Sequence, residues 1–250
     1  MHTECPKCGH VLSIPLPDSA ACPVCGIYFF KYSRYRSGPA SHIETTSSSF
    51  NLREFIERLL EPLDEIDAPT FYGRCLVLGL LAIWSCFLFA DDYRTGEIGI
   101  SFMHNILLPI HEAGHVLFTP LGTFMAVLGG SLFQLLLPFG VSIAFIWINR
   151  DNAGAAVATW WAGASFLDLA PYVYDARHPR LMLLGGHTGE DGPHDWVYLL
   201  TALGQLPNSQ RWGAAVHTLG GIVMLIAISW ALSVLWRQRR LIRKNTSDVR

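Results

Sequence analysis

Two histidines and a glutamate in the middle of the chain have the spacing of a metal site. His111, Glu112 and His115 form the pattern His-Glu-x-x-His. Residues four apart share one face of a helix, so both imidazoles can reach one metal ion, and the glutamate between them can act as general base on metal-bound water. This chemistry is hydrolytic, and Zn²⁺ is the metal that such residues hold in metallopeptidases.

The surroundings of this motif are apolar, which makes its charge informative. It lies in the stretch ILLPIHEAGHVLFTPLG, where Glu112 is the one charged residue. An ionisable group at membrane depth costs several kcal/mol unless it has a partner or a function. The alternative is a pair of core histidines with a buried glutamate that is hydrogen-bonded between helices. His104 would share nearly the same helix face as His111, and we expect it to make a polar contact with another helix.

A His-Glu-x-x-His motif inside an apolar helix resembles the site-2 protease class of intramembrane zinc metalloproteases. The resemblance implies a third ligand, an aspartate that opens a later helix. Asp195, in the stretch GPHDW before the apolar VYLL, is the nearest match, although His194 replaces an apolar residue and no glycine follows. A helix N-terminus favours a carboxylate. His194 and Asp168 remain the alternative third ligands, because an imidazole binds zinc well and because Asp168 is the one charge between residues 152 and 174.

Long apolar runs must position these residues. The chain has 250 residues, 51% of them apolar and 15% charged, with a formal net charge of -2, which argues against disordered and nucleic-acid-coating proteins. Charges are scarce in five runs, 75–90, 98–119, 121–149, 152–174 and 212–236. A membrane-spanning helix needs about 20 mainly apolar residues. We therefore expect an all-α polytopic membrane protein with about five to six transmembrane helices.

The two chain ends indicate orientation. The tail after Trp236 begins with five basic residues in eight positions, which predicts a cytosolic C-terminus. The first residues resemble no cleavable signal, so the N-terminus is also expected in the cytosol. Five crossings would put the ends on opposite sides. Either a sixth segment crosses, or the run with the histidines or the short WVYLLTALGQL enters and leaves on one face.

Four cysteines near the N-terminus form a second metal pattern. Cys5 and Cys8 make one Cys-x-x-Cys pair, and Cys22 and Cys25 make another after 13 intervening residues. Four thiolates complete a tetrahedral structural zinc site, and a segment this short needs the metal to fold. A pair of disulfides is the alternative, disfavoured in the cytosol. The segment resembles the zinc ribbons at the ends of many prokaryotic proteins.

These patterns divide the chain into four parts. We expect a zinc ribbon at 1–36, a linker with an amphipathic helix at 37–70, a multi-pass metalloprotease-like domain at 71–236 and a basic cytosolic tail at 237–250. The helix within 37–70 follows from apolar residues at helical spacing from Leu52 to Leu63. The basic and aromatic KYSRYR, at 31–36, is the one stretch that would suit nucleic acid, which we do not expect as a partner.

The patterns together predict an intramembrane zinc metalloprotease in a prokaryotic inner (cytoplasmic) membrane. It would carry one catalytic and one structural Zn²⁺, and would hydrolyse a peptide bond in or near the transmembrane segment of a membrane protein. Its partners would be the lipid bilayer, that substrate and a protein that binds the ribbon. The alternatives are a metal-binding membrane scaffold or adaptor without proteolysis, and an ion transporter with His and Asp on an ion path.

Overall fold

The computed structural model describes residues 2–5, 7–17, 19–29, 51–63, 66–96, 99 and 101–248, with side chains described as far as residue 242. The predicted basic stretch 31–36 and the Ser/Thr-rich part of the linker, 37–50, lie outside the described residues. The chain divides into two compact units, Met1–Asn51 and Leu52–Arg250. Each unit is described by itself.

The first unit contains a small two-stranded sheet and two turns, at residues 7–8 and 23–25. Strands β1 (His2–Glu4) and β2 (Val11–Leu16) are antiparallel, with His2 opposite Leu16. Its core is one cluster of four side chains: Cys5, Leu12, Cys22 and Phe29. Two of these four side chains are cysteines, so contacts made by their sulfur atoms contribute much of the stability of this small unit.

The second unit is built from helices, which confirms the expected helical class in its coarse form. In chain order they are α2 (Leu52–Leu59), α3 (Ala68–Ala90), α4 (Phe102–Phe118), α5 (Thr123–Ala144), α6 (Asn152–Asp175), α7 (Asp195–Ala202) and α8 (Ser209–Asp248). Short turns η2 (Thr119–Leu121), η3 (Phe145–Asn149) and η4 (Leu206–Asn208) join or extend them. Polar caps begin several helices; Asp67, for example, accepts a hydrogen bond from the Thr70 N–H at the start of α3.

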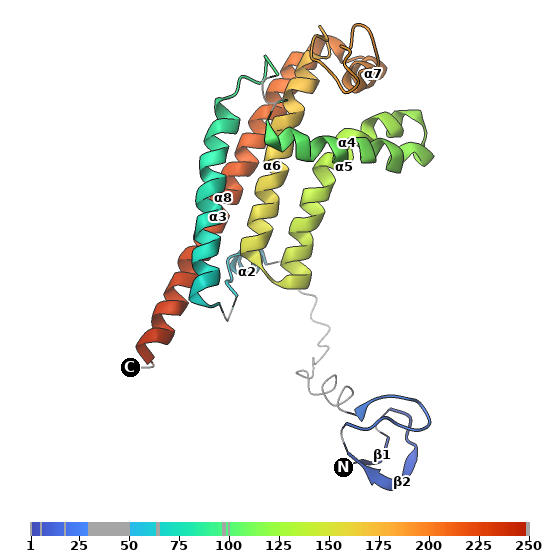
Figure 1. Cartoon of the computed structure of the whole chain (residues 1–250), viewed down its shortest axis with the longest axis vertical. Helices are drawn as coiled ribbons and strands as arrows, with labels where there is room; N and C mark the ends of the chain where they lie inside the picture. Colours follow the sequence, from blue (N-terminus) through green and yellow to red (C-terminus); the bar gives the residue numbers. More distant parts are fainter. Residues whose placement is uncertain are drawn as a thin grey trace. The chain divides into compact units, whose positions relative to one another are not determined.

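Helix α6 lies between the long helices α3, α5 and α8 (Figure 1). It is rich in alanine and glycine, and most of its residues are buried. Gly163 lies so close to α8 that a Cβ there would be 2.8 Å from the Met224 backbone nitrogen and 3.0 Å from the Gly220 carbonyl oxygen. Small side chains on α6 therefore allow the long helices to approach closely.

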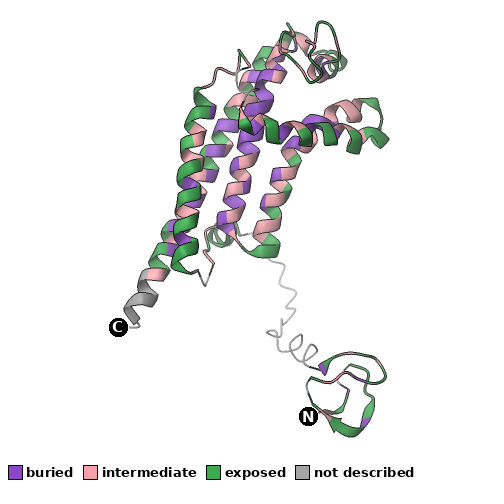
Figure 2. Cartoon of the chain, viewed as in Figure 1, coloured by how far each residue is buried: buried purple, intermediate pink, exposed green. Residues whose placement is uncertain are grey.

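The outer faces of the bundle are apolar although they are exposed. Figure 2 shows exposed residues along the outer side of α3 and buried residues along α6. On α3 the exposed large side chains are Tyr72, Leu76, Val77, Leu80, Ile83, Phe87 and Phe89. Within the described parts of the chain, three helices are long and apolar enough to cross a membrane: Ala68–Ala90, Thr123–Asn149 and Leu206–Ile242.

The bundle has two chemically different ends. At the tail end, where α8 finishes, Arg74 pairs with Asp151 at 2.8 Å, and the Asn152 amide donates to the carbonyl groups of Arg58 and Glu61. At the opposite loop end, Tyr93 packs against Tyr174 with ring centroids 5.6 Å apart. The described residues of the connection between α3 and α4, 91–96, 99 and 101, and the connection 176–194 lie at the loop end (Figure 1).

Helix α4 does not run along the bundle like its neighbours. It begins beside α6 and runs across the direction of the long helices, away from α3 (Figure 1), and its 17 residues span about 25 Å, less than the roughly 30 Å of a bilayer core. It packs against α5 through Gly114 and Gly129, where a Cβ on Gly129 would lie 2.6 Å from the Gly114 carbonyl oxygen. This close approach brings α5 against the histidine face of α4.

Candidate metal centre

The histidine pair lies on α4, one helical turn apart. The Ser101 hydroxyl accepts a hydrogen bond from the His104 N–H at 3.2 Å and begins this helix. His111 and His115 then share one face, with ring centroids 4.8 Å apart. His111 is buried and His115 is partly buried. Both rings direct Nε2 toward the same point, where a third residue meets them.

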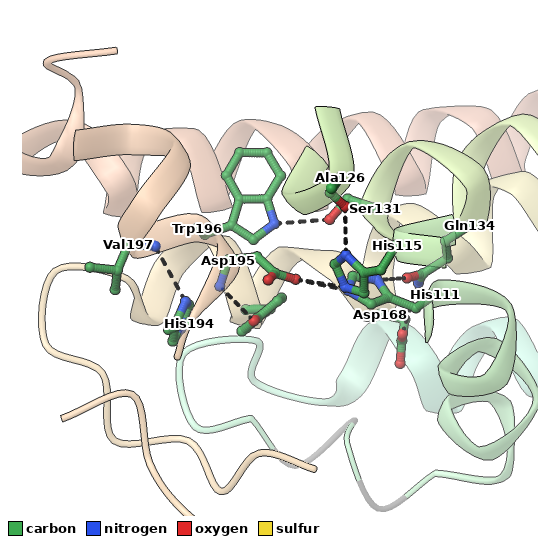
Figure 3. Close-up of polar contacts among 11 residues, drawn as sticks. His111, His115, Ala126, Ser131, Gln134, Asp168, His194, Asp195, Trp196 and Val197 are labelled. Atoms are coloured by element: carbon green, nitrogen blue, oxygen red, sulfur yellow. Dashed lines mark hydrogen bonds and ion pairs between the residues drawn. The ribbon is translucent and has the colours of Figure 1, made fainter. Parts of the chain in front are cut away.

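Asp195 is that third residue, and it comes from the start of α7. Its Oδ2 lies 3.1 Å from His111 Nε2 and 3.2 Å from His115 Nε2 (Figure 3). His194 caps this helix, since its Nδ1 accepts from the Val197 N–H. The Asp195 N–H donates to the Tyr172 hydroxyl oxygen at 2.9 Å, which ties the start of α7 to α6.

The other nitrogen of each ring determines which tautomer is present. His115 Nδ1 is 2.8 Å from the Ala126 carbonyl oxygen, which can only accept, so Nδ1 carries the proton. His111 Nδ1 is 2.9 Å from Gln134 Oε1. The Gln134 amide nitrogen donates to Asp168 Oδ2 at 3.0 Å, which turns its oxygen toward His111. With both Nδ1 atoms protonated, each neutral ring presents a lone pair at Nε2.

When both rings are neutral, three acceptor atoms therefore face one another with no donor between them. Ligand atoms of His111, His115 and Asp195 all lie within 4.8 Å of one another. Around tetrahedral zinc with ligand distances of about 2.1 Å, neighbouring ligand atoms are roughly 3.4 Å apart, close to the 3.1 and 3.2 Å found here. The three ligand atoms and the hydrogen bonds behind them are compatible with metal binding.

A glycine keeps this point free of side chains. A Cβ on Gly130 would lie 2.5 Å from His115 Nε2 and 2.6 Å from His111 Nε2. Gly130 is buried in α5 next to Gly129 and Ser131, and the Ser131 hydroxyl accepts from the Trp196 indole N–H at 3.1 Å. The space in front of the two Nε2 atoms is thus preserved by α5 as well as by the ligands.

The two alternative ligands lie elsewhere. Asp168, on α6, accepts from Gln134 and has its Oδ1 2.9 Å from His104 Nδ1, so it sits behind His111 and not in front of it. The His104 ring makes the contact between helices that the sequence predicts. His194 is occupied as the cap of α7, and its Nε2 is 3.6 Å from Asp175 Oδ2. Of the three candidates, Asp195 is the one that meets both histidines.

Glu112 lines a cavity together with the metal ligands. The cavity has a volume of about 630 Å³, and its wall includes His111, Glu112, His115, Tyr172 and Asp195. Glu112 is exposed, in contrast to its buried neighbour His111. Residues of the two loop-end connections, such as Gly96 and Leu184, complete the wall. Water can therefore occupy the space beside the ligands and the glutamate.

Two residues of this centre were not assigned from the sequence. Gln134 is the one amide or charged residue between Leu121 and Ile148, and this isolation was a usable signal, because a polar side chain among apolar ones needs a partner. Tyr172 offered no such signal. Its position opposite the backbone of Asp195 depends on how α6 and α7 meet.

The four cysteines form a separate cluster in the first unit. Cys5 Sγ lies 3.7 Å from Cys25 Sγ, and Cys8 Sγ lies 3.8 Å from Cys22 Sγ. Sulfur atoms around tetrahedral zinc at about 2.3 Å are about 3.8 Å apart. The N–H groups of Cys25 and Val24 lower the pKa of the Cys22 thiol. Burial raises the pKa of Cys5, but the N–H groups of Cys8 and Lys7 outweigh it and bring the pKa to about 6, which favours the thiolate of Cys5, whereas the pKa of Cys8 is raised to about 12 beside the other thiols.

Comparisons with protein-family models, with curated proteins and with solved structures found no match for this chain.

Proposed function

We propose that the chain is a membrane-embedded zinc metallopeptidase that hydrolyses a peptide bond in or near the transmembrane segment of another membrane protein. The observation that carries the proposal is that His111 Nε2, His115 Nε2 and Asp195 Oδ2, three atoms able to bind a metal, meet at one point. A general base, Glu112, lines the same cavity. The likeness of the histidine motif to site-2 proteases, with an aspartate at the start of a later helix, supports the same assignment.

His111, His115 and Asp195 would hold the metal and leave a fourth position open toward the cavity. Bound there, Zn²⁺ supplies Lewis acidity that polarises a carbonyl group and makes water more acidic. Glu112 accepts the proton of the attacking water and passes it to the nitrogen of the leaving amine. Gln134 holds the Nδ1 proton of His111 and thereby keeps its Nε2 available.

Membrane insertion is the second part of the proposal. Three helices have the length and composition to span a bilayer, and the exposed face of α3 carries large apolar side chains, an arrangement that water disfavours. A cavity lined by polar groups would admit water to the site within such a bundle. The substrate would then be a polypeptide segment that lies in the membrane.

The four cysteines would bind a second, structural zinc ion and complete a zinc ribbon in the first unit. Their spacing near 3.8 Å and the lowered pKa of Cys22 support this role. A ribbon of this kind can dock a partner protein, and it contributes no group to the peptidase chemistry.

The test compares wild type with Glu112→Gln in expressing cells, by mass spectrometry of protein N-termini in the membrane fraction. Glu112→Gln keeps the size of the side chain and removes the base, so we expect metal content to stay the same and cleavage to fall 10²–10⁴-fold. New N-termini in or near transmembrane segments should appear with wild type alone. Identical sets of N-termini in both, with full metal content, would favour the scaffold over the peptidase.

An ion transporter is separated from the peptidase by flux. A transporter would move ions into proteoliposomes in a manner that depends on Asp168 and not on Glu112. The peptidase requires no such flux.

A further inference from the structure

We infer that the metal cavity opens on the side of the membrane opposite the basic C-terminal tail, so that its substrate is a polypeptide segment emerging from the bilayer at the extracytosolic face. The inference rests on the proposed membrane insertion, and its statement about the substrate rests also on the proposed peptidase. Position, connectivity and charge each point to this orientation.

The metal centre lies close to the loop end of the bundle. On α6, Asp168 stands 7 residues before the last residue, Asp175, and 16 residues after the first, Asn152. At 1.5 Å per residue these separations are about 10 Å and about 24 Å. One side chain, Gln134, hydrogen-bonds to both His111 and Asp168. His111 therefore lies at nearly the same distance from the loop end as Asp168.

The loop-end connections complete the cavity. Thr95 and Gly96 from one connection, and Arg180 and Leu184 from the other, line it. The two connections touch, because Gly96 faces the Leu181 side chain. Thr95, Arg180 and Leu184 are exposed, so the cavity reaches the surface at this end. A segment approaching from the loop end would meet the metal centre without crossing the bundle.

Both parts of the chain that leave the bundle do so at the tail end. The carbonyl groups of Arg58 and Glu61, just after α2, accept from Asn152 at the start of α6. Helix α8 begins at the loop end, where the Ser209 hydroxyl is 3.4 Å from the Tyr174 carbonyl oxygen, and finishes at the tail end (Figure 1). In this arrangement the three candidate spans, on α3, α5 and α8, cross the membrane together with α6, a 24-residue helix buried between them, whereas the short helices α4 and α7 do not.

Four crossings return both chain ends to one side. This agrees with two cytosolic ends, which five apolar runs, each taken as a crossing, would contradict. In this arrangement α4 enters the membrane from the loop end and places His111 and His115 below the membrane surface.

Basic residues are concentrated at the tail end. The side chains there are Arg53, Arg58, Arg74, Arg150, Arg237, Arg239 and Arg240, and the sequence continues with Arg243 and Lys244. At the loop end the basic residues are Arg94, Arg177, Arg180 and Arg211. Loops rich in Lys and Arg stay in the cytosol. The tail end is then cytosolic, and the cavity faces the other compartment.

Aromatic side chains mark the loop end as an interface. Tyr93 stacks on His217 with ring centroids 4.4 Å apart and meets Tyr174 edge-on. Trp212, the fourth residue of α8, is half exposed at the same end. Such rings prefer the headgroup level of a bilayer. The metal centre then lies about 10 Å below that level on the extracytosolic side.

Cysteine labelling of the full chain in intact expressing cells tests the orientation. Cys75 and Cys86 are replaced by Ala, and one cysteine is added either by Glu190→Cys, in an exposed connection at the loop end, or by Ser247→Cys, in the tail. The probe is a membrane-impermeant maleimide; neither substitution changes the number of basic residues, and the labelled site is identified by peptide mass spectrometry. We expect Cys at 190 to react in intact cells and Cys at 247 to react after permeabilisation only.

The opposite pattern, or equal labelling of both positions in intact cells, would overturn the orientation. The experiment does not depend on cleavage. If the labelling agrees and the N-termini still do not differ between wild type and Glu112→Gln, the peptidase is wrong and the orientation stands.

Discussion

At the scale of single residues, the proposed metal centre also depends on side chains that are not themselves ligands. Gln134 joins two helices to the site: its oxygen accepts from His111 Nδ1, and its nitrogen donates to Asp168 Oδ2. Because a carboxylate can only accept, Asp168 determines which way the amide points, and the amide determines which nitrogen of His111 is free. Asp168 and Gln134 are positioning residues.

Removing this hydrogen bond should weaken metal binding without abolishing it. In Gln134→Leu, His111 loses the acceptor for its Nδ1 proton, and we expect the affinity for Zn²⁺ at this centre to fall 10–100-fold. Competition with a chelator of known affinity measures this change. The control is Ser142→Ala, which removes a buried hydroxyl on the same helix that bonds to Ala155 and Thr159, away from the site. Equal affinity in Gln134→Leu and wild type would disprove the positioning role.

One added methyl group should block the centre altogether. Gly130→Ala places a Cβ about 2.5 Å from both Nε2 atoms, in the space where a cation must sit, and backbone on α5 cannot move away cheaply. We expect metal analysis to find the ribbon ion alone in this variant. Gly140→Ala is the matched control, since a Cβ there meets nothing within 4 Å. Retention of both ions by Gly130→Ala would place the metal somewhere else.

Local spacing made part of this centre predictable from sequence. His111, Glu112 and His115 lie within one helix, so their geometry follows from the 3.6-residue repeat. Asp195 is 84 residues beyond His111, and only a resemblance pointed to it. The carbonyl group of Ala126 has no signature in a sequence, because every residue carries one.

At the scale of elements, the centre depends on how closely helices approach α6 and α4. The Ala- and Gly-rich surface of α6 lets α8 come within backbone contact, and Gly114 and Gly129 do the same for α4 and α5. These contacts place α7, which follows α6, so that Asp195 meets the histidines. The packing of small residues is thus a condition for the metal site and not only for stability.

A methyl group between α6 and α8 tests this condition. In Gly163→Ala the new Cβ would lie 2.8 Å from the Met224 nitrogen, and overpacking of this kind costs typically about 1–3 kcal/mol. We expect a lower Tm for the detergent-solubilised protein. Gly79→Ala, on the exposed face of α3 with open space around it, should leave the Tm unchanged or raise it slightly. An equal response of the two variants would contradict the close packing.

The elements themselves were predictable to different degrees. Long apolar runs identified α3, α5 and α8, since length and composition suffice for a spanning helix. The apolar run 98–119 predicted the helix α4. It did not predict the direction of this helix, because composition does not indicate whether a helix lies across its neighbours. Helix α6 is apolar through alanine, and its place between the others follows from packing, which acts between distant parts of the chain.

At the scale of the whole molecule, two compact units carry two candidate metal sites of different chemistry. Thiolates in Met1–Asn51 suit a closed structural site, and two imidazoles with one carboxylate in Leu52–Arg250 suit an open one beside a cavity. The sequence indicated both sites, since each is anchored by a short motif. From the sequence, the expected number of membrane crossings disagreed with two cytosolic chain ends. Whether that number is odd or even depends on whether α4 spans the membrane, which is decided by how the helices pack.

The most direct test of the metal centre is the metal content per chain of the purified full-length protein, measured by mass spectrometry of the elements. The comparison uses wild type, a Cys5→Ser/Cys8→Ser variant, a His111→Ala/His115→Ala variant and the combination of all four substitutions. We expect two zinc ions in wild type, one in each double variant and none in the combination. A zinc content that does not change when both histidines are replaced would contradict the centre formed by His111, His115 and Asp195, and the peptidase with it.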